Sequence, residues 1–321
     1  CDYGFHLIIT DPTPNVLGQE LPALVEDGYT SFKVFMTYDD MVLDDRQLLD
    51  VFDCARGCGA LVMVHCEGYD AIRYMTEKLE RAGKTAPYYH GASRPQVVER
   101  EAAHRAISHA ELVDVPIMIV HVSGREAMEQ IRWAQQKGLK IYGETCTQYI
   151  ALTADDMKGL NMDETGGKYV CSPPPRDKES QQACWEGLQQ GIFSLFSSDH
   201  CPFRYDDPQG KLAPKGKTSF RWVPNGIPGV ETRLPLLFAG VVDGRLDLDR
   251  FVELTAAGPA KMYGLHPRKG VIAIGSDADL VVWDASRPVT IAQADLHSDC
   301  DYTPYEGITV PAWPEVVVQR G

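Results

Sequence analysis

Short apolar runs alternate with amphipathic stretches along the first 200 residues of the chain. Six runs are rich in β-branched and aromatic residues, and they predict strands at 5–9, 31–37, 60–67, 115–123, 139–146 and 192–200. Between these runs, helical spacing of apolar residues predicts helices at 22–28, 44–59, 69–82, 95–111, 124–138 and 179–190. Strands that are apolar on both faces are buried on both sides, so the pattern indicates a parallel sheet covered by helices.

The alternation leaves two architectures open. A doubly wound sheet and a (β/α)8 barrel both fit, although six strands are two fewer than a closed barrel needs. Residues 201–228 are rich in Pro, Gly and Lys and predict a long loop, followed by helices at 229–241 and 247–264. From residue 270 short β-like runs predict a separate small sheet. We therefore expect two domains, at 1–268 and 269–321.

Net charge and cysteine content disfavour some classes of binding partner and favour one cellular compartment. The net charge of −14 disfavours nucleic acid and anionic membranes, because both require a basic protein surface. No stretch approaches the roughly 20 apolar residues of a membrane span. The nine cysteines include no C-x-x-C pair, so we interpret them as reduced thiols of a cytoplasmic protein.

Three predicted strands end in residues that can bind a metal. His65 and His121 each follow an apolar run, and Asp199 follows the last one. The carboxyl ends of parallel strands gather at one mouth of a barrel, where active sites are built. One such histidine is as easily explained by a structural role. Two histidines and an aspartate at equivalent positions favour a site for a divalent transition metal.

Lys33 is a charged residue inside an apolar run, SFKVF. It either lies on the solvent side of an edge strand or is held inside because its amine has a chemical role. An ammonium group has no acceptor and cannot bind a metal. Desolvation lowers the pKa of a buried amine, and a neutral amine can add carbon dioxide. The resulting carbamate is an anionic, two-oxygen group that can bridge two metals.

These residues lie within motifs that carry a family resemblance. The motifs are FKVFMTY (32–38), VHCEG (64–68), IVHVSG (119–124), GETCTQY (143–149), CSPPPR (171–176), SSDHCP (197–202), PNGIPGVETR (224–233) and KGVIAIGSDADLVVWD (269–284). The chain resembles the dihydropyrimidinase/D-hydantoinase branch of the amidohydrolase superfamily over essentially its whole length. The resemblance implies an α/β fold: a (β/α)8 TIM-type barrel that lacks its first strands, plus a remnant of a small β-sandwich.

The resemblance also implies a ligand set for two divalent ions, expected to be zinc. A carbamate on Lys33 would bridge the ions. His65 and His121 would bind one ion, and Asp199 would bind the other and shuttle a proton. Tyr38 would stabilise the oxyanion that forms at the attacked carbonyl.

Two further residues would bind the substrate ring, largely through main-chain atoms: Ser172 and Asn225. The alternatives are plain turn residues, since Ser172 precedes three prolines and Asn225 lies in a Pro-Asn-Gly turn. Phe35 is a candidate lining residue of the substrate pocket. The remaining histidines, including His200 beside Asp199, are interpreted as structural.

The implied reaction is hydrolytic ring opening of dihydropyrimidines or 5-substituted hydantoins to N-carbamoyl amino acids. The implied partners are a small cyclic amide substrate and further copies of the chain in a homotetramer. Allantoinase, dihydroorotase and a non-catalytic scaffold protein are the alternatives within the superfamily.

One family motif is missing. Members supply further ligands for the second metal as an H-x-H pair on the first barrel strand, and these 321 residues contain no such pair. We expect that the chain is truncated at its N-terminus. We also expect that it is inactive by itself, although Lys33, His65 and His121 could still hold one metal.

Overall fold

A curved sheet of six parallel strands forms the centre of the molecule. The computed structural model describes residues 2–321. The strands follow one another in chain order, as β1 (Leu7–Ile8), β2 (Ser31–Phe35), β3 (Leu61–His65), β4 (Ile117–Ile119), β5 (Ile141–Cys146) and β6 (Leu195–Ser197). All six predicted strands are confirmed. Within residues 2–321 the edge strands β1 and β6 do not pair with each other, so the sheet is an incomplete barrel.

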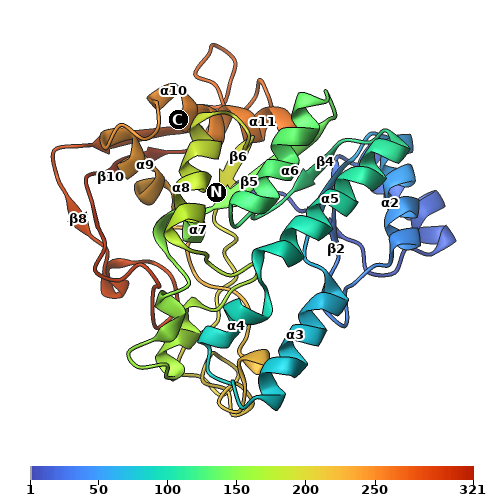
Figure 1. Cartoon of the computed structure of the whole chain (residues 1–321). Coiled ribbons are helices and arrows are strands. Elements are labelled where there is room, and N and C mark those ends of the chain that lie inside the picture. The colour runs from blue at the N-terminus through green and yellow to red at the C-terminus, as the bar shows by residue number, and fades with distance from the viewer. Residues whose placement is uncertain (1) are drawn as a thin grey trace.

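Helices cover the outer face of this sheet (Figure 1). The principal ones are α1 (Leu21–Glu26), α2 (Asp45–Cys58), α5 (Gln96–Val113), α6 (Arg125–Gln136), α8 (Lys178–Gln189) and α9 (Arg233–Val242). Helix α3 (Tyr69–Arg81) lies outside this layer and contacts α4 (Tyr88–Ser93). Neighbouring helices in the layer contact one another, α2 with α5, α5 with α6 and α6 with α8. The main hydrophobic core lies between these helices and the strands. Burial of the apolar helix faces is therefore what holds this layer on the sheet.

Successive side chains of each strand point alternately to the outer face of the sheet, under the helices, and to its inner face. On β3, Val62 and Val64 enter the main core under the helices, whereas Leu61 and Met63 belong to a second apolar cluster on the inner face. Successive side chains in a strand point to opposite faces. His65 therefore lies on the inner face, at the carboxyl end of the strand.

Local signals explain several helix boundaries. Asp44 caps α2 through a hydrogen bond from the Gln47 amide, and the Gln47 side chain accepts from the Asp44 amide. The helix ends at Cys58 and is followed by Gly59, whose φ of 75° suits a residue without a Cβ. The predicted helix at 247–264 is divided into α10 (Leu248–Val252), a π-helical turn (Glu253–Ala257) and α11 (Gly258–Met262).

Two short α-helices of the described residues were not predicted: α4 (Tyr88–Ser93) and α7 (Thr147–Ala151). Each contains only five or six residues, so neither provides the two turns of periodicity on which the prediction relies. Residues 201–228 form the expected long loop, which contains a single 3-10 turn (Phe220–Trp222).

The C-terminal strands form two separate pairs. Strand β7 (Leu280–Asp284) pairs antiparallel with β10 (Trp313–Val318), and β8 (Val289–Thr290) pairs with β9 (Thr309–Val310). The prediction of one small sheet was wrong in this respect. The β8–β9 pair lies in an apolar cluster with Leu152 and Cys171 of the barrel. The domain boundary at 268/269 stays a prediction.

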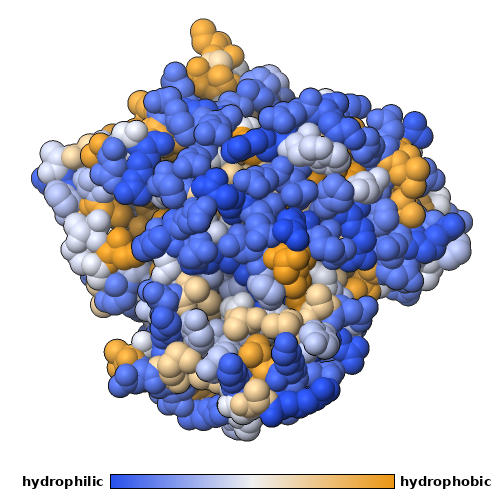
Figure 2. Space-filling view, viewed as in Figure 1, coloured by the Kyte–Doolittle hydropathy of each residue, from blue (hydrophilic) through white to orange (hydrophobic). Residues whose placement is uncertain are grey.

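The visible surface is mostly hydrophilic, with an apolar projection at the top of Figure 2 above α10 and α11. Ile272 and Ile274, in the segment after α11, are strongly exposed. Among the described helices, none combines the length and hydropathy that crossing a bilayer requires.

Candidate active site

Four predicted site residues meet at the carboxyl ends of β2, β3 and β4. Phe35 of β2 lies in register with His65 of β3. The ring centroid of His65 is 4.4 Å from that of His121 and 5.1 Å from that of Tyr38. The parallel register of the strands thus places residues that are far apart in sequence within one group.

The Lys33 amine is enclosed on the inner face of the sheet. The residue as a whole is half-buried, but its Nζ atom is shut off from solvent and finds no hydrogen-bond partner among residues 2–321. Nζ lies 3.9 Å from the centroid of the Phe35 ring. Burial lowers the pKa of the amine to about 8, and the negative charge of Asp199 opposes this shift. The alternative of a solvent-facing lysine was therefore wrong, and a neutral amine is accessible near neutral pH.

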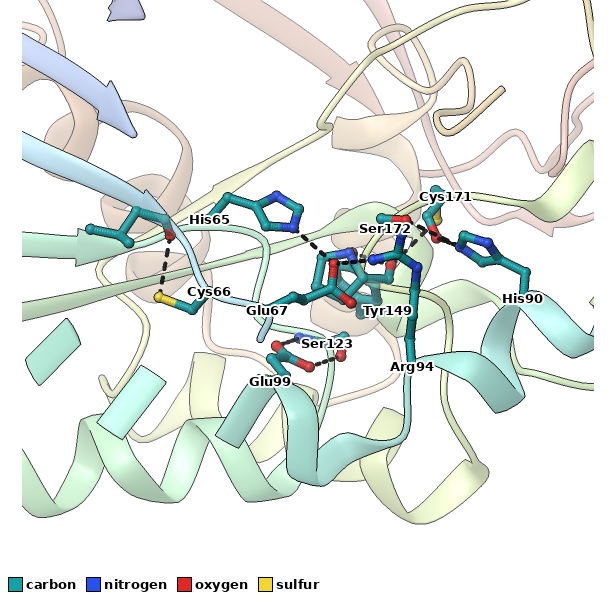
Figure 3. Close-up of polar contacts among 12 residues, drawn as sticks. His65, Cys66, Glu67, His90, Arg94, Glu99, Ser123, Tyr149, Cys171 and Ser172 are labelled. Carbon is teal, nitrogen blue, oxygen red and sulfur yellow. Dashed lines mark hydrogen bonds and ion pairs between the residues drawn. The ribbon is translucent and has the colours of Figure 1, made fainter. Parts of the chain in front are cut away.

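His65 is held by a buried carboxylate (Figure 3). The Glu67 Oε2 atom lies 2.8 Å from Nε2 of His65 and accepts a hydrogen bond of 2.9 Å from Nη1 of Arg94. Burial lowers the pKa of His65 to about 4, so the ring is neutral. Burial alone would raise the pKa of Glu67, but Arg94 and His65 outweigh it and bring the value to about 2. An ionised Glu67 requires a proton on Nε2 of His65, which leaves Nδ1 as the nitrogen free to bind a metal.

His121 also has a free nitrogen. Its Nδ1 atom is buried and without a hydrogen-bond partner in the described part of the chain. Burial, the neighbouring His65 and Lys33 keep the pKa of its ring well below the usual value. Its backbone amide donates a 3.3 Å hydrogen bond to Oε2 of Glu144. Burial raises the pKa of Glu144 to about 7, against the hydrogen bond from Ser197.

Three of the candidate residues have left-handed backbone conformations. The φ angles are 77° at Tyr38, 42° at His121 and 44° at Asp199. Such angles are uncommon for residues other than glycine and cost about 1–3 kcal/mol each. Strain of this kind concentrates at functional sites, and here it occurs where each chain segment leaves the sheet.

Part of the donor set fits one divalent ion. Lys33, His65 and His121 offer an enclosed unpaired amine and two neutral imidazoles, which suit one divalent ion once the amine is a carbamate. Burial raises the pKa of Asp199 against the pull of Lys33. Within residues 2–321, the donor atoms of His65, His121 and Asp199 do not all lie within 4.8 Å of one another.

One group of three acidic residues, Asp2, Asp277 and Asp279, places its carboxylate oxygens within 4.8 Å of one another. Among the described residues it is the only group of three His, Cys, Asp or Glu side chains that meets this distance. Lys269 Nζ forms ion pairs with all three carboxylates, so this acidic cluster already has its cation.

A second buried ion pair joins three segments of the site. Arg176 Nη2 lies 3.0 Å from Glu99 Oε2, and its Nε donates a 2.8 Å hydrogen bond to Ser123 Oγ. Its Nη1 donates to the backbone carbonyl of Arg94, and Ser123 Oγ donates to Glu99. Ser123 is two residues after His121, so the network fixes the backbone that carries the His121 side chain.

The predicted substrate-binding residues lie beside this group. Ser172 Oγ is 3.1 Å from Nε2 of His90, which also lies 3.0 Å from the carbonyl oxygen of Cys171. Tyr38, His90, Arg94 and Asn225 line a cavity of about 160 Å³, a size that accommodates a small ring. Asn225 Oδ1 is buried and unpaired within residues 2–321. Lys33, His121 and Asp199 are not among the lining residues of this cavity.

Sequence reasoning assigned no role to several charged residues around the site, namely Glu67, Arg94, Glu99, Glu144 and Arg176. The available signal was a charged residue inside or next to an apolar motif, as in VHCEG, GETC and CSPPPR. Such residues are rarely fully buried unless they are paired.

The chain is similar to known proteins over its whole length. The model of the Amidohydrolase family matches residues 19–321. D-hydantoinases from Rhizobium radiobacter and Ralstonia pickettii are 45% and 46% identical over 321 residues, which are 100% of this chain and 69% of each relative. The crystal structure of dihydropyrimidinase from Brevibacillus agri NCHU1002 matches with a TM-score of 0.95 and 40% identity, over 100% of this chain and 68% of that one. The chain thus spans about two thirds of the length of these relatives.

Proposed function

The chain belongs to the amidohydrolase family, and from this premise we propose that it carries the ring-opening site of a cyclic amidase for dihydropyrimidines and 5-substituted hydantoins. The observation that carries the proposal is the enclosed amine of Lys33, which has no hydrogen-bond partner within residues 2–321, near the His65–His121 pair. The named relatives are D-hydantoinases and a dihydropyrimidinase, which supports cyclic amides as the substrate class.

We propose the following ligands. The Lys33 carbamate, His65 and His121 would hold one divalent ion, and the carbamate with Asp199 would contribute to a second. Zinc suits these nitrogen and oxygen donors. When bound, such ions polarise the substrate carbonyl and lower the pKa of water.

The residues of the chain would then perform the remaining steps. Asp199 takes a proton from the attacking water and transfers it to the leaving ring nitrogen, so that the C–N bond breaks and an N-carbamoyl amino acid forms. Its raised pKa favours this exchange. The Tyr38 hydroxyl donates a hydrogen bond to the oxyanion. Its own pKa is raised by burial, so it remains a donor. Backbone groups of Ser172 and Asn225 orient the ring amides.

Dihydroorotate is a less well supported substrate, because it carries a carboxylate. Allantoin, which has none, stays an alternative. A substrate carboxylate requires a free cation, and Arg94, which lines the cavity, is already paired with Glu67. The eight cysteines described in the structure are free thiols, which favours a reducing compartment such as the cytoplasm. Assembly into a homo-oligomer stays a prediction.

We propose that this chain alone binds one metal and turns over substrate poorly, because the sequence provides no H-x-H pair. Metal analysis after reconstitution with Zn²⁺ tests this, with one ion per chain expected. Two ions per chain together with full hydantoin turnover would refute the proposal that this chain alone lacks the second metal site. ¹³C NMR after addition of ¹³C-bicarbonate tests the carbamate independently, and its signal should be absent from Lys33→Ala.

The reaction itself is tested in a fusion that joins this chain to the part of the Rhizobium radiobacter relative that it does not match, hereafter the completed fusion. We expect hydantoin ring opening by the completed fusion, and loss of metal and activity in its Lys33→Ala form. A short carboxylic acid should restore part of that activity by replacing the carbamate oxygens. A completed fusion that is folded and metal-loaded but leaves hydantoin and dihydrouracil intact would refute the function.

A further inference from the structure

One lysine of the long loop between β6 and α9 is buried. Lys211 is 2% exposed, and its Nζ donates hydrogen bonds of 2.7 Å to the Val170 carbonyl and 2.6 Å to the Pro224 carbonyl. Among the described residues no carboxylate forms an ion pair with it. Burying an unpaired amine is costly, so a buried lysine bound only by carbonyl groups requires an explanation.

The two carbonyl groups belong to two separate segments. Val170 precedes Ser172 by two residues, and Pro224 directly precedes Asn225. The Val170 carbonyl also accepts a 3.1 Å hydrogen bond from the Gly226 amide. Segments 170–172 and 224–226 are therefore joined once by the backbone and once by Lys211. His90 holds Cys171 and Ser172 through separate contacts.

We propose that Lys211 is a positioning residue that clamps segments 170–172 and 224–226 together, so that their backbone groups can bind the substrate ring. This inference rests on the proposed function for the roles of Ser172 and Asn225. The clamp acts through these residues, because the hydrogen bonds of Nζ within residues 2–321 go to the carbonyl groups of Val170 and Pro224. Nζ also lies 5.8 Å from the centroid of the Phe203 ring, which offers no hydrogen-bond acceptor oxygen. Neither segment belongs to a sheet strand or an α-helix at these positions, so no strand or helix ladder fixes their separation.

The alternative is that Lys211 only fills space. A space-filling role is kept when the amine is replaced by an apolar group of similar shape, whereas a clamp needs the donor. The variant Lys211→Met removes the donor and keeps the length of the side chain. It leaves the Pro224 carbonyl without its partner, and the Val170 carbonyl with the Gly226 amide only.

Amide hydrogen exchange on this chain is the first test. We expect the Gly226 amide to exchange about 10-fold faster in Lys211→Met, since loss of one hydrogen bond shifts local opening by about that factor. The Ile107 amide, in the core of α5, should change less than about 2-fold. The exposed Lys215→Met of the same loop is the matched control and should leave both amides unchanged. Unchanged protection of Gly226, or equal acceleration of both amides, would overturn the clamp.

A second variant covers the case in which Lys211→Met does not fold. Lys211→Gln keeps a donor on a shorter side chain, and we expect an intermediate acceleration of the Gly226 amide. Unfolding of both variants would assign Lys211 to global stability and would also overturn the proposal.

Turnover by the completed fusion connects the clamp to substrate binding. We expect Lys211→Met to raise KM for hydantoin about 10-fold and to change kcat less than about 3-fold, because the reacting groups are untouched. A fall in kcat with unchanged KM would contradict a positioning role. If the completed fusion is inactive even without substitution, the proposed function fails, while hydrogen exchange still decides whether the clamp exists.

Discussion

The buried Arg176–Glu99 pair gives the sharpest stability prediction. The side chains are 6% and 3% exposed and 3.0 Å apart. Replacing Arg176 by Met removes the contacts to Glu99, Ser123 and the Arg94 carbonyl together. Removal of one partner of a buried pair costs about 3–5 kcal/mol, because the other charge stays buried without compensation. Burial already raises the pKa of Glu99, so part of this cost will be relieved by proton uptake.

A double-mutant cycle separates pairing from packing. We expect Arg176→Met and Glu99→Gln each to lower the free energy of unfolding, and the double variant to lose at least about 2 kcal/mol less than their sum. For a chain of this length, about 4 kcal/mol corresponds to a fall in Tm of about 6 °C. Arg46→Met is the control, since Arg46 and Asp50 form an exposed i, i+4 pair worth less than about 0.5 kcal/mol.

The assay is urea unfolding followed by circular dichroism at pH 7, with equal m values required for the comparison. A loss below about 1 kcal/mol for Arg176→Met, or additivity within about 0.5 kcal/mol, would refute the view that this pair fixes the backbone next to His121.

Three further predictions concern single residues. Burial lowers the pKa of Lys211 from the ordinary 10.5 to about 7. Between these two pH values the unfolded chain binds more protons than the folded chain. The contribution of Lys211 to the free energy of unfolding therefore rises by about 1.4 kcal/mol per pH unit in this range. Unfolding across pH 7–10 should show this slope reduced by one proton in Lys211→Met, and equal slopes would contradict the burial. Gly226 has a φ of +135° and an added Cβ would lie 2.5 Å from the Cys201 carbonyl oxygen, so Gly226→Ala should lose at least about 2 kcal/mol in urea unfolding, and a neutral result would contradict the strain. Tyr38→Phe in the completed fusion should lower kcat for hydantoin about 100-fold with little change in KM, whereas an unchanged kcat would remove Tyr38 from the oxyanion site.

The strands could be predicted, and candidate ligands could be placed at their ends, because these signals are local. Apolar runs placed six parallel strands, and polar residues at the ends of these runs identified His65, His121 and Asp199 as candidates. The helix covering each strand followed from spacing of 3.6 residues. These features depend on neighbouring residues alone, so the sequence reveals them directly. The roles of the candidates as ligands stay predictions.

The short helices and the C-terminal pairing were not predictable in the same way. Helices α4 and α7 are too short to show a period. Strands β7 and β10 pair across about 30 residues of intervening chain, and β8 and β9 attach instead to the barrel. Long-range packing decides which strands pair, and a single sequence carries no direct record of it.

The sequence by itself determined which residues could do chemistry: a lysine in an apolar strand, two histidines and an aspartate at strand ends, and a tyrosine five residues after the lysine. Only the tertiary structure decided their states. It encloses the Lys33 amine away from water, places the Glu67 carboxylate within hydrogen-bond distance of His65, and buries Lys211 between two loop carbonyl groups. The physical reason is that desolvation and charge pairing depend on distances across the fold, whereas residue type and spacing are properties of the chain alone.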